Sequence, residues 1–134
     1  MSDFAKPAEK LVLLVDDDES LLDLMEHVVK KEGFRTGRAM DGQEALTKVD
    51  ALKPDAIVLD FMLPNLSGYE ALREFQARGW GDIPVLVVTG RVLDAASIED
   101  VRREPNVKEF LQKPVRPMML TAALHRILRT APNT

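Results

Sequence analysis

Three short apolar runs without polar alternation constrain the fold of this chain most strongly. They are LVLLV at 11–15, AIVLD at 56–60 and IPVLVV at 83–88. A strand with one face in water alternates apolar and polar residues, whereas a strand covered on both faces is apolar almost throughout. The runs therefore predict buried strands of a parallel sheet. FRTGRA at 34–39 and EFLQ at 109–112 are weaker candidates that fit the same spacing.

Amphipathic patterns lie between the predicted strands. Apolar residues follow the i, i+4, i+7, i+8 spacing of a helix within 21–29 and again within 120–128. Shorter apolar stripes predict helices around 45–52, 72–75 and 93–103, the last being the least firmly held. A strand followed by a helix, repeated five times, predicts an α/β fold of three layers, in which helices cover both faces of a five-stranded parallel sheet.

Size and composition limit the classes of function. The 134 residues, 46% of them hydrophobic, suit one domain, which we place at 11–130 between short tails at 1–10 and 131–134. The absence of cysteine excludes disulfides and thiol chemistry. No apolar stretch resembles a signal peptide or a membrane span, so we expect a cytoplasmic protein.

Charge is spread unevenly along the chain. Residues 1–100 carry 20 acidic and 11 basic side chains, whereas residues 101–134 carry 2 acidic and 7 basic ones. An acidic chain with one small basic segment is a poor candidate for direct binding of nucleic acid. A solvated basic helix face is the favoured explanation of the pattern over a docking surface, and a partner protein is a better candidate for binding than nucleic acid.

Chemistry-bearing residues follow the predicted strands. Asp16 and Asp17 come after the first strand, Asp60 ends the third, Thr89 follows the fourth and Lys113 follows the fifth. The carboxyl ends of parallel strands form one edge of a sheet, and ligands bind there. Three carboxylates, a hydroxyl and an ammonium are therefore predicted to meet at this edge.

Such a group of side chains suits phosphoryl transfer. Crowded carboxylates stay ionised at neutral pH only when a cation compensates their charge. Oxygen ligands without histidine or cysteine suit Mg²⁺ (or Mn²⁺), which also binds phosphate oxygens. An aspartate can attack phosphorus to give an acyl phosphate, while a lysine, a hydroxyl and the metal ion neutralise the transferring group.

Four segments taken in order, LLVDDDES, IVLDFMLPNLSG, VLVVTG and EFLQKP, resemble the receiver domain of two-component response regulators. The resemblance covers about residues 10–130 and implies a flavodoxin-like (βα)₅ fold with Asp60 as the phosphoacceptor. It implies that Asp17 binds Mg²⁺ directly and that Asp16 acts largely through a metal-bound water. The backbone carbonyl of Met62 would complete the protein ligands.

The same resemblance assigns roles on the fourth and fifth strands. Lys113 would pair with the phosphoryl group and with Asp60, and Thr89 would hydrogen-bond a phosphoryl oxygen after modification. Phe110 occupies the position of the aromatic switch of the family. The peptide bond between Lys113 and Pro114 is expected to be cis, as in the family.

The sequence supports further predictions for two residues near Asp60 and Thr89 and for the turn before the fifth predicted strand. Met62 and Arg91 are the second residues after Asp60 and Thr89, so we predict that they tune the lifetime of the acyl phosphate. Where many receivers have a glycine-containing turn, this chain has Pro105-Asn106, and an asparagine can adopt the left-handed conformation.

Other residues have structural explanations. One residue among Asp18, Glu19 and Ser20 is expected to cap the first helix, whose positive end favours acidic side chains. His27 and His125 are interpreted as ordinary helix residues, because the histidine of phosphotransfer domains lies in a helical bundle.

The resemblance implies a Mg²⁺-dependent phosphoacceptor in two-component or phosphorelay signalling, a signalling switch rather than an enzyme. A histidine kinase or a histidine phosphotransfer protein would phosphorylate Asp60. The surface of 93–103, 109–112 and 120–128 would then change and bind a downstream protein or a fused output domain. The starting methionine and short tails favour a free-standing receiver over one excised from a longer protein.

Two enzyme or cofactor classes compete with this interpretation. A phosphatase of the haloacid-dehalogenase type also uses an aspartate nucleophile and Mg²⁺, but it needs a second acid at the place of Met62. A flavin-binding protein needs a Ser/Thr/Gly-rich phosphate loop after the first strand, where this chain has DDDES.

Overall fold

A computed structural model of the protein describes residues 4–90 and 95–131. Its sheet contains five strands: β1 (Leu11–Val15), β2 (Arg35–Ala39), β3 (Ala56–Asp60), β4 (Val85–Thr89) and β5 (Val107–Gln112). All neighbouring strands are parallel, in the order β2-β1-β3-β4-β5. The predicted α/β fold and its five-stranded parallel sheet are confirmed.

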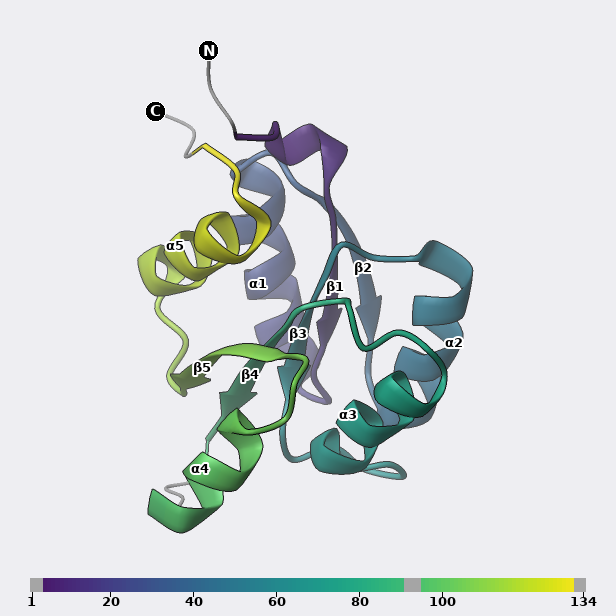
Figure 1. The fold of residues 1–134 in the computed structure, drawn as a ribbon. Helices are drawn as coiled ribbons and strands as arrows, with labels where there is room; N and C mark the ends of the chain where they lie inside the picture. The colour runs from purple at the N-terminus through teal and green to yellow at the C-terminus, as the bar shows by residue number, and fades with distance from the viewer. Residues whose placement is uncertain (1–3, 91–94, 132–134) are drawn as a thin grey trace.

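Helices alternate with the strands and cover both faces of the sheet (Figure 1). They are the 3-10 helix η1 (Pro7–Glu9) and the α-helices α1 (Glu19–Lys31), α2 (Gly42–Leu52), α3 (Gly68–Ala77), α4 (Ala95–Arg102) and α5 (Pro117–Leu128). Side chains of α1 and α5 pack on one face, and those of α2, α3 and α4 pack on the other. This is the predicted arrangement of three layers.

The lack of polar alternation in the strands follows from this double covering. Val12 and Leu14 of β1 pack toward α1 and α5, whereas Leu13 and Val15 pack toward the opposite helices, and all four are fully buried. Burying such side chains stabilises the fold by roughly 1.5 to 3 kcal/mol each. The edge strand β2 is more exposed, which matches its weaker apolar pattern.

Polar side chains define where three helices begin. Asp18 accepts a hydrogen bond from the Leu21 amide and caps α1, as expected for this acidic stretch. Asp41 caps α2 in the same way, and Ser67 caps α3 in a reciprocal pair with Glu70. These caps satisfy amide groups that have no partner within the helix.

The turn before β5 contains Pro105-Asn106 in place of a glycine. An asparagine can adopt the left-handed conformation, but Asn106 does not use it, because its φ is not positive. Its side chain is instead fully buried, where it accepts a hydrogen bond from Gln76 and donates one to the Leu72 carbonyl. Asn106 therefore serves as a polar link to α3. β5 also begins two residues earlier than predicted, at Val107.

The first ten residues, predicted as a tail, include an ordered segment. Ala5 forms a β-bridge with Thr130, and the Arg35 side chain binds the backbone carbonyls of Ala8 and Glu9. These contacts lie at the opposite end of the molecule from the carboxyl ends of the strands (Figure 1). The division into a domain and two tails stays a prediction.

Candidate functional site

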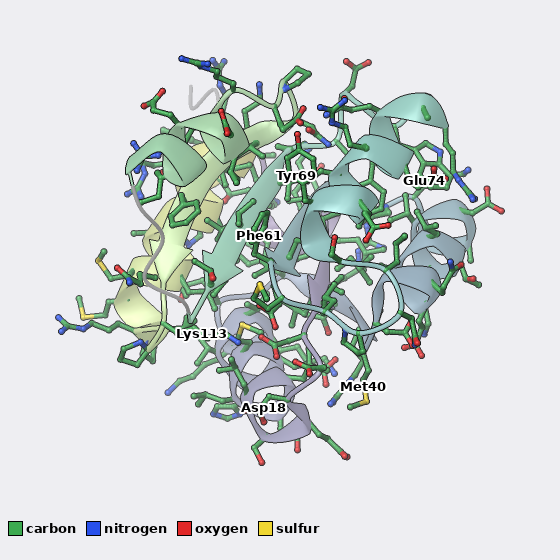
Figure 2. All side chains as sticks on the ribbon, turned by 90° about the horizontal axis from the view of Figure 1, so that it is seen from below. Asp18, Met40, Phe61, Tyr69, Glu74 and Lys113 are labelled. Carbon is green, nitrogen blue, oxygen red and sulfur yellow. The ribbon has the colours of Figure 1, made fainter. Side chains whose placement is uncertain are left out.

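The predicted functional residues lie at the carboxyl edge of the sheet, which Figure 2 views from below. Backbone hydrogen bonds between neighbouring strands fix their positions. The Asp16 amide donates to the Ala39 carbonyl at 3.1 Å, and the Lys113 amide donates to the Thr89 carbonyl at 2.8 Å. The parallel register therefore brings together residues that are far apart in the sequence.

Three carboxylates form a compact acidic pocket. Asp16, Asp17 and Asp60 each offer one oxygen, and these oxygens lie within 4.8 Å of one another. Asp16 is 1% exposed and Asp60 is 3% exposed, whereas Asp17 faces solvent. The predicted convergence of the three acids is thus present, with one open side.

Lys113 brings a positive charge to the pocket. Its ammonium lies 3.0 Å from Asp16 Oδ2 and 3.5 Å from Asp60 Oδ2. Figure 2 shows it near the middle of the edge, between Phe61 and the start of α1. Its aliphatic stem passes over Gly90, where an added Cβ would lie 3.4 Å from Lys113 Cδ. The lysine stem therefore packs against the end of the β4 segment on its way to the acids.

Burial and neighbouring charges shift the pKa values of Asp60 and Lys113. Burial, followed by the negative charge of Asp16, raises the pKa of Asp60 to about 6, although the Met62 amide and Lys113 act in the opposite direction. Burial alone would lower the pKa of Lys113, but the carboxylates of Asp16 and Asp60 outweigh it and the net shift is upward. Lys113 is therefore an ammonium at neutral pH.

The pocket fits a hard divalent cation. Asp16 Oδ1 and Asp60 Oδ1 accept hydrogen bonds from the amides of Asp18 and Met62. Asp16 Oδ2 is buried and has no hydrogen bond of good geometry, so its contact with Lys113 is an ion pair only. A buried oxygen beside two further carboxylates is the donor set that Mg²⁺ prefers.

The other predicted site residues lie around this pocket. Thr89 is fully buried at the end of β4, and Met62 is 45% exposed just after β3. Phe110 is half-buried on β5, with the Arg102 guanidinium 5.9 Å from its ring centre. Arg91 lies outside the described residues. The peptide bond between Lys113 and Pro114 is cis, as expected.

The two histidines lie away from the pocket. His27 is exposed on α1. His125 is buried, and its ring nitrogens lie 2.6 Å from Thr130 Oγ1 and 2.8 Å from Glu32 Oε1. This link between α5, α1 and the end of the domain is structural, and the helical pattern of the sequence did not reveal it.

Sequence patterns also missed a contact between the loop after β3 and the start of α2. Asn65, in the loop after β3, donates a hydrogen bond to Asp41 at the start of α2. Asp41-Gly42 is recognisable in the sequence as a turn, but nothing in the pattern indicates which loop packs against it.

Comparison with known families assigns this site to a class. A profile described as "Response regulator receiver domain" matches residues 12–125. The chain belongs to the response-regulator receiver family. It is a phosphoacceptor signalling domain of two-component systems, with Asp16, Asp17, Asp60 and Lys113 in its acidic pocket. This match favours the receiver interpretation over the phosphatase and flavin alternatives.

Curated relatives include longer regulators. The chain is 34% identical over 120 residues to the alkaline phosphatase synthesis transcriptional regulatory protein PhoP of Bacillus subtilis, covering 90% of this chain and 49% of that protein. It is 34% identical over 118 residues to the DNA-binding response regulator MtrA of Mycobacterium tuberculosis, covering 88% of this chain and 50% of that protein. The chain thus spans about half the length of these relatives.

Solved receiver structures share the fold. The signal receiver domain of a putative Luxo repressor protein from Vibrio parahaemolyticus gives a TM-score of 0.81 at 26% identity, covering 90% of both chains. The receiver domain of the sensor histidine kinase PA1611 from Pseudomonas aeruginosa gives 0.79 at 26% identity, covering 90% of this chain and 98% of that one. That structure holds a magnesium ion coordinated in its active site cleft.

No described helix of the present chain is long and apolar enough to span a bilayer.

Proposed function

We propose that this chain accepts a phosphoryl group on Asp60 from a histidine kinase or a histidine phosphotransfer protein. One observation carries the proposal: the buried Asp60 carboxylate lies at a strand end, within 4.8 Å of two further carboxylates and 3.5 Å from the Lys113 ammonium. This arrangement offers a nucleophile, ligands for a cation and a fixed positive charge at one place.

In the proposed transfer an Asp60 oxygen attacks phosphorus and forms an acyl phosphate. The bond between phosphorus and the donor imidazole breaks, and the imidazole keeps the electron pair and takes up a proton. The Met62 amide holds Asp60 Oδ1, which fixes the carboxylate at the strand end. Lys113 offsets the charge of the arriving group, since it lies against Asp60.

Mg²⁺ (or Mn²⁺), when bound, supplies positive charge for the phosphoryl oxygens. Asp17 and Asp60 would be direct ligands, together with the backbone carbonyl of Met62, and Asp16 would act largely through a bound water. The exposure of Asp17 gives the pocket an open side, and the buried Asp16 oxygen without a hydrogen bond supports a role for this carboxylate beside a cation.

Thr89 and Phe110 would carry the signal to the surface. Thr89 would hydrogen-bond a phosphoryl oxygen, and Phe110 would change rotamer as the end of β4 moves. Its present position beside Arg102 places this ring against the α4 side of β5. The surface of α4, β5 and α5 would then bind a downstream protein or a fused output domain. This surface includes the basic residues Arg102, Arg103, Lys108 and Arg116.

Met62 and Arg91 would tune the lifetime of the acyl phosphate. Met62 is 45% exposed beside the pocket, so its side chain can limit the access of water to Asp60. The receiver would thus assist its own phosphorylation and dephosphorylation without acting as a classical enzyme. The partner class and the lack of cysteine favour a cytoplasmic location.

Incubation with acetyl phosphate and Mg²⁺, followed by intact-protein mass spectrometry, tests the proposal. We expect one phosphoryl adduct on the wild type, none on Asp60→Ala and none when the metal is chelated. Asp50→Ala, which alters an exposed carboxylate on α2, is the matched control and should be modified like the wild type. No adduct on the wild type, or an equal adduct on Asp60→Ala, would contradict the proposal.

A further inference from the structure

The β3–α3 loop, residues 61–67, is attached to the start of α2. Asn65 has a φ of 67°, and its side-chain amide donates to Asp41 Oδ2 at 3.1 Å. The other oxygen of the same carboxylate, Asp41 Oδ1, accepts from the Glu44 amide at 2.7 Å and caps α2. One carboxylate therefore joins a helix start to the loop that follows Asp60.

Close backbone packing accompanies this hydrogen bond. A Cβ on Gly42 would lie 2.3 Å from the Leu66 carbonyl oxygen, so the loop backbone rests directly on the α-carbon of Gly42. At the far end of the loop, a Cβ on Gly68 would lie 2.6 Å from Phe61 Cα, and the Gly68 amide donates to the Phe61 carbonyl. The loop is thus held at its end on β3 and against α2.

The β3–α3 loop also carries Met62, whose backbone contacts the acidic pocket. The Met62 amide donates to Asp60 Oδ1 at 3.1 Å, and its carbonyl is the proposed backbone ligand for Mg²⁺. Backbone ligands act at a fixed geometry only when the loop that carries them is fixed, because small displacements weaken binding. The hydrogen bond between Asp41 and Asn65 lies outside the pocket, but Asn65 is on the same loop as Met62.

We propose that Asp41 and Asn65 are positioning residues for the metal site, acting through the β3–α3 loop on the Met62 backbone. This inference rests on the proposed function, since it concerns how the same pocket binds its cation. Without the hydrogen bond the loop samples more conformations, and the cation must then order it on binding.

Two variants remove the hydrogen bond and keep the local structure of each partner. Asp41→Ser retains a good N-cap for α2 but has no second oxygen for Asn65. Asn65→Gly removes the side-chain amide but keeps a residue that adopts positive φ readily. Asp50→Ser makes the same chemical change as Asp41→Ser on α2, at an exposed pair with Lys53, and is the matched control.

The experiment is a titration of the metal-free proteins with Mg²⁺, followed by backbone amide NMR shifts. Each variant should bind Mg²⁺ about 3- to 10-fold more weakly than the wild type, which is the effect expected from one exposed hydrogen bond to a carboxylate. The Asp41→Ser/Asn65→Gly double variant should be no weaker than either single one, because both remove the same bond. The Met62 amide signal should shift in the metal-free variants, and Asp50→Ser should match the wild type.

Each outcome has a definite meaning. Binding within about twofold of the wild type in both single variants overturns the positioning role. Losses that multiply in the double variant also overturn it, since the residues would then act separately. If Asp41→Ser fails to fold, Asn65→Gly alone decides in the same way. A wild type that binds no Mg²⁺ in this pocket contradicts the proposed function, whereas a wild type that binds, with unaffected variants, contradicts only the positioning role.

Discussion

The Lys113 ammonium lies 3.5 Å from the Asp60 carboxylate, yet the pKa of Asp60 is raised to about 6. Burial of Asp60 is the main cause, and the negative charge of Asp16 adds to it. Lys113 also lies closer to Asp16, at 3.0 Å, so its charge is shared between the two acids. Within the described part of the chain, this single lysine leaves the pocket short of positive charge, which a bound cation would supply.

Mg²⁺ affinity should depend on pH in a range set by Asp60. A protonated carboxyl is a poor ligand for Mg²⁺. The affinity for Mg²⁺ should therefore be highest above about pH 7 and should fall as the pH drops through 6. Calorimetric titration between about pH 5 and pH 8 measures this. A dissociation constant that stays flat over this range would contradict the assignment of Asp60 as a ligand.

Asp60→Asn should stabilise the metal-free protein. Because the folded-state pKa of Asp60 lies above its ordinary value of 3.8, the folded protein binds the extra proton, and stability from this group is lost as the pH rises from about 4 to 6. The neutral amide avoids this loss, so we expect a gain of about 1 to 3 kcal/mol at pH 8.

Urea unfolding in the presence of a chelator measures this gain, and the difference from the wild type should shrink toward zero near about pH 4. A variant that is less stable than the wild type at the higher pH would show that ionised Asp60 is well compensated without metal.

Lys113→Gln should raise the pKa of Asp60 above 6. Among the described residues, Lys113 is the only cation that contacts Asp60, and the variant removes it while leaving both burial and the Asp16 charge in place. Carbon-13 NMR titration of the side-chain carboxyl reports this pKa directly. An unchanged or lower value would mean that Lys113 does not act on Asp60 in solution.

Glu104 lies outside the acidic pocket, and Glu104→Ala should lower the free energy of unfolding. Burial would raise the pKa of Glu104, but a hydrogen bond from Gln76 and the contact with Arg73 outweigh it and lower the pKa. We expect a loss of about 1 to 2 kcal/mol at neutral pH. The stabilisation is present above the ordinary pKa of 4.5 and is lost as the pH falls through the lowered value.

Urea unfolding checks this loss, and Glu74→Ala is its control. Glu74 pairs with Arg78 on the exposed face of α3, so its removal should cost less than about 0.5 kcal/mol. Equal losses of unfolding free energy in the two variants would show that the partly buried contacts of Glu104 stabilise the fold no more than an exposed ion pair does.

The strand ends were predictable from the sequence for a physical reason. A parallel sheet places the carboxyl ends of its strands together, so locating Asp16, Asp60 and Lys113 in the sequence was enough to place them in one pocket. A cap among Asp18, Glu19 and Ser20 was also predictable, because capping depends only on residues within one turn, and the structure shows that it is Asp18.

Contacts between loops were not predictable in this way. The bond between Asp41 and Asn65, and the burial of Asn106 against α3, depend on how loops far apart in the sequence pack. The Asn106 side chain bonds Gln76 and the Leu72 carbonyl, and the φ of this residue is not positive. Neither the partner nor the burial can be read from spacing.

We propose that Asp60, rather than another acid of the pocket, carries the phosphoryl group. Borohydride reduces an acyl phosphate to an alcohol, which marks the modified aspartate permanently. After incubation with acetyl phosphate and Mg²⁺, reduction and peptide mass spectrometry should find this mark at position 60 alone. A mark at Asp16 or Asp17, or no mark in the wild-type protein, would contradict the assignment of Asp60 as the phosphoacceptor.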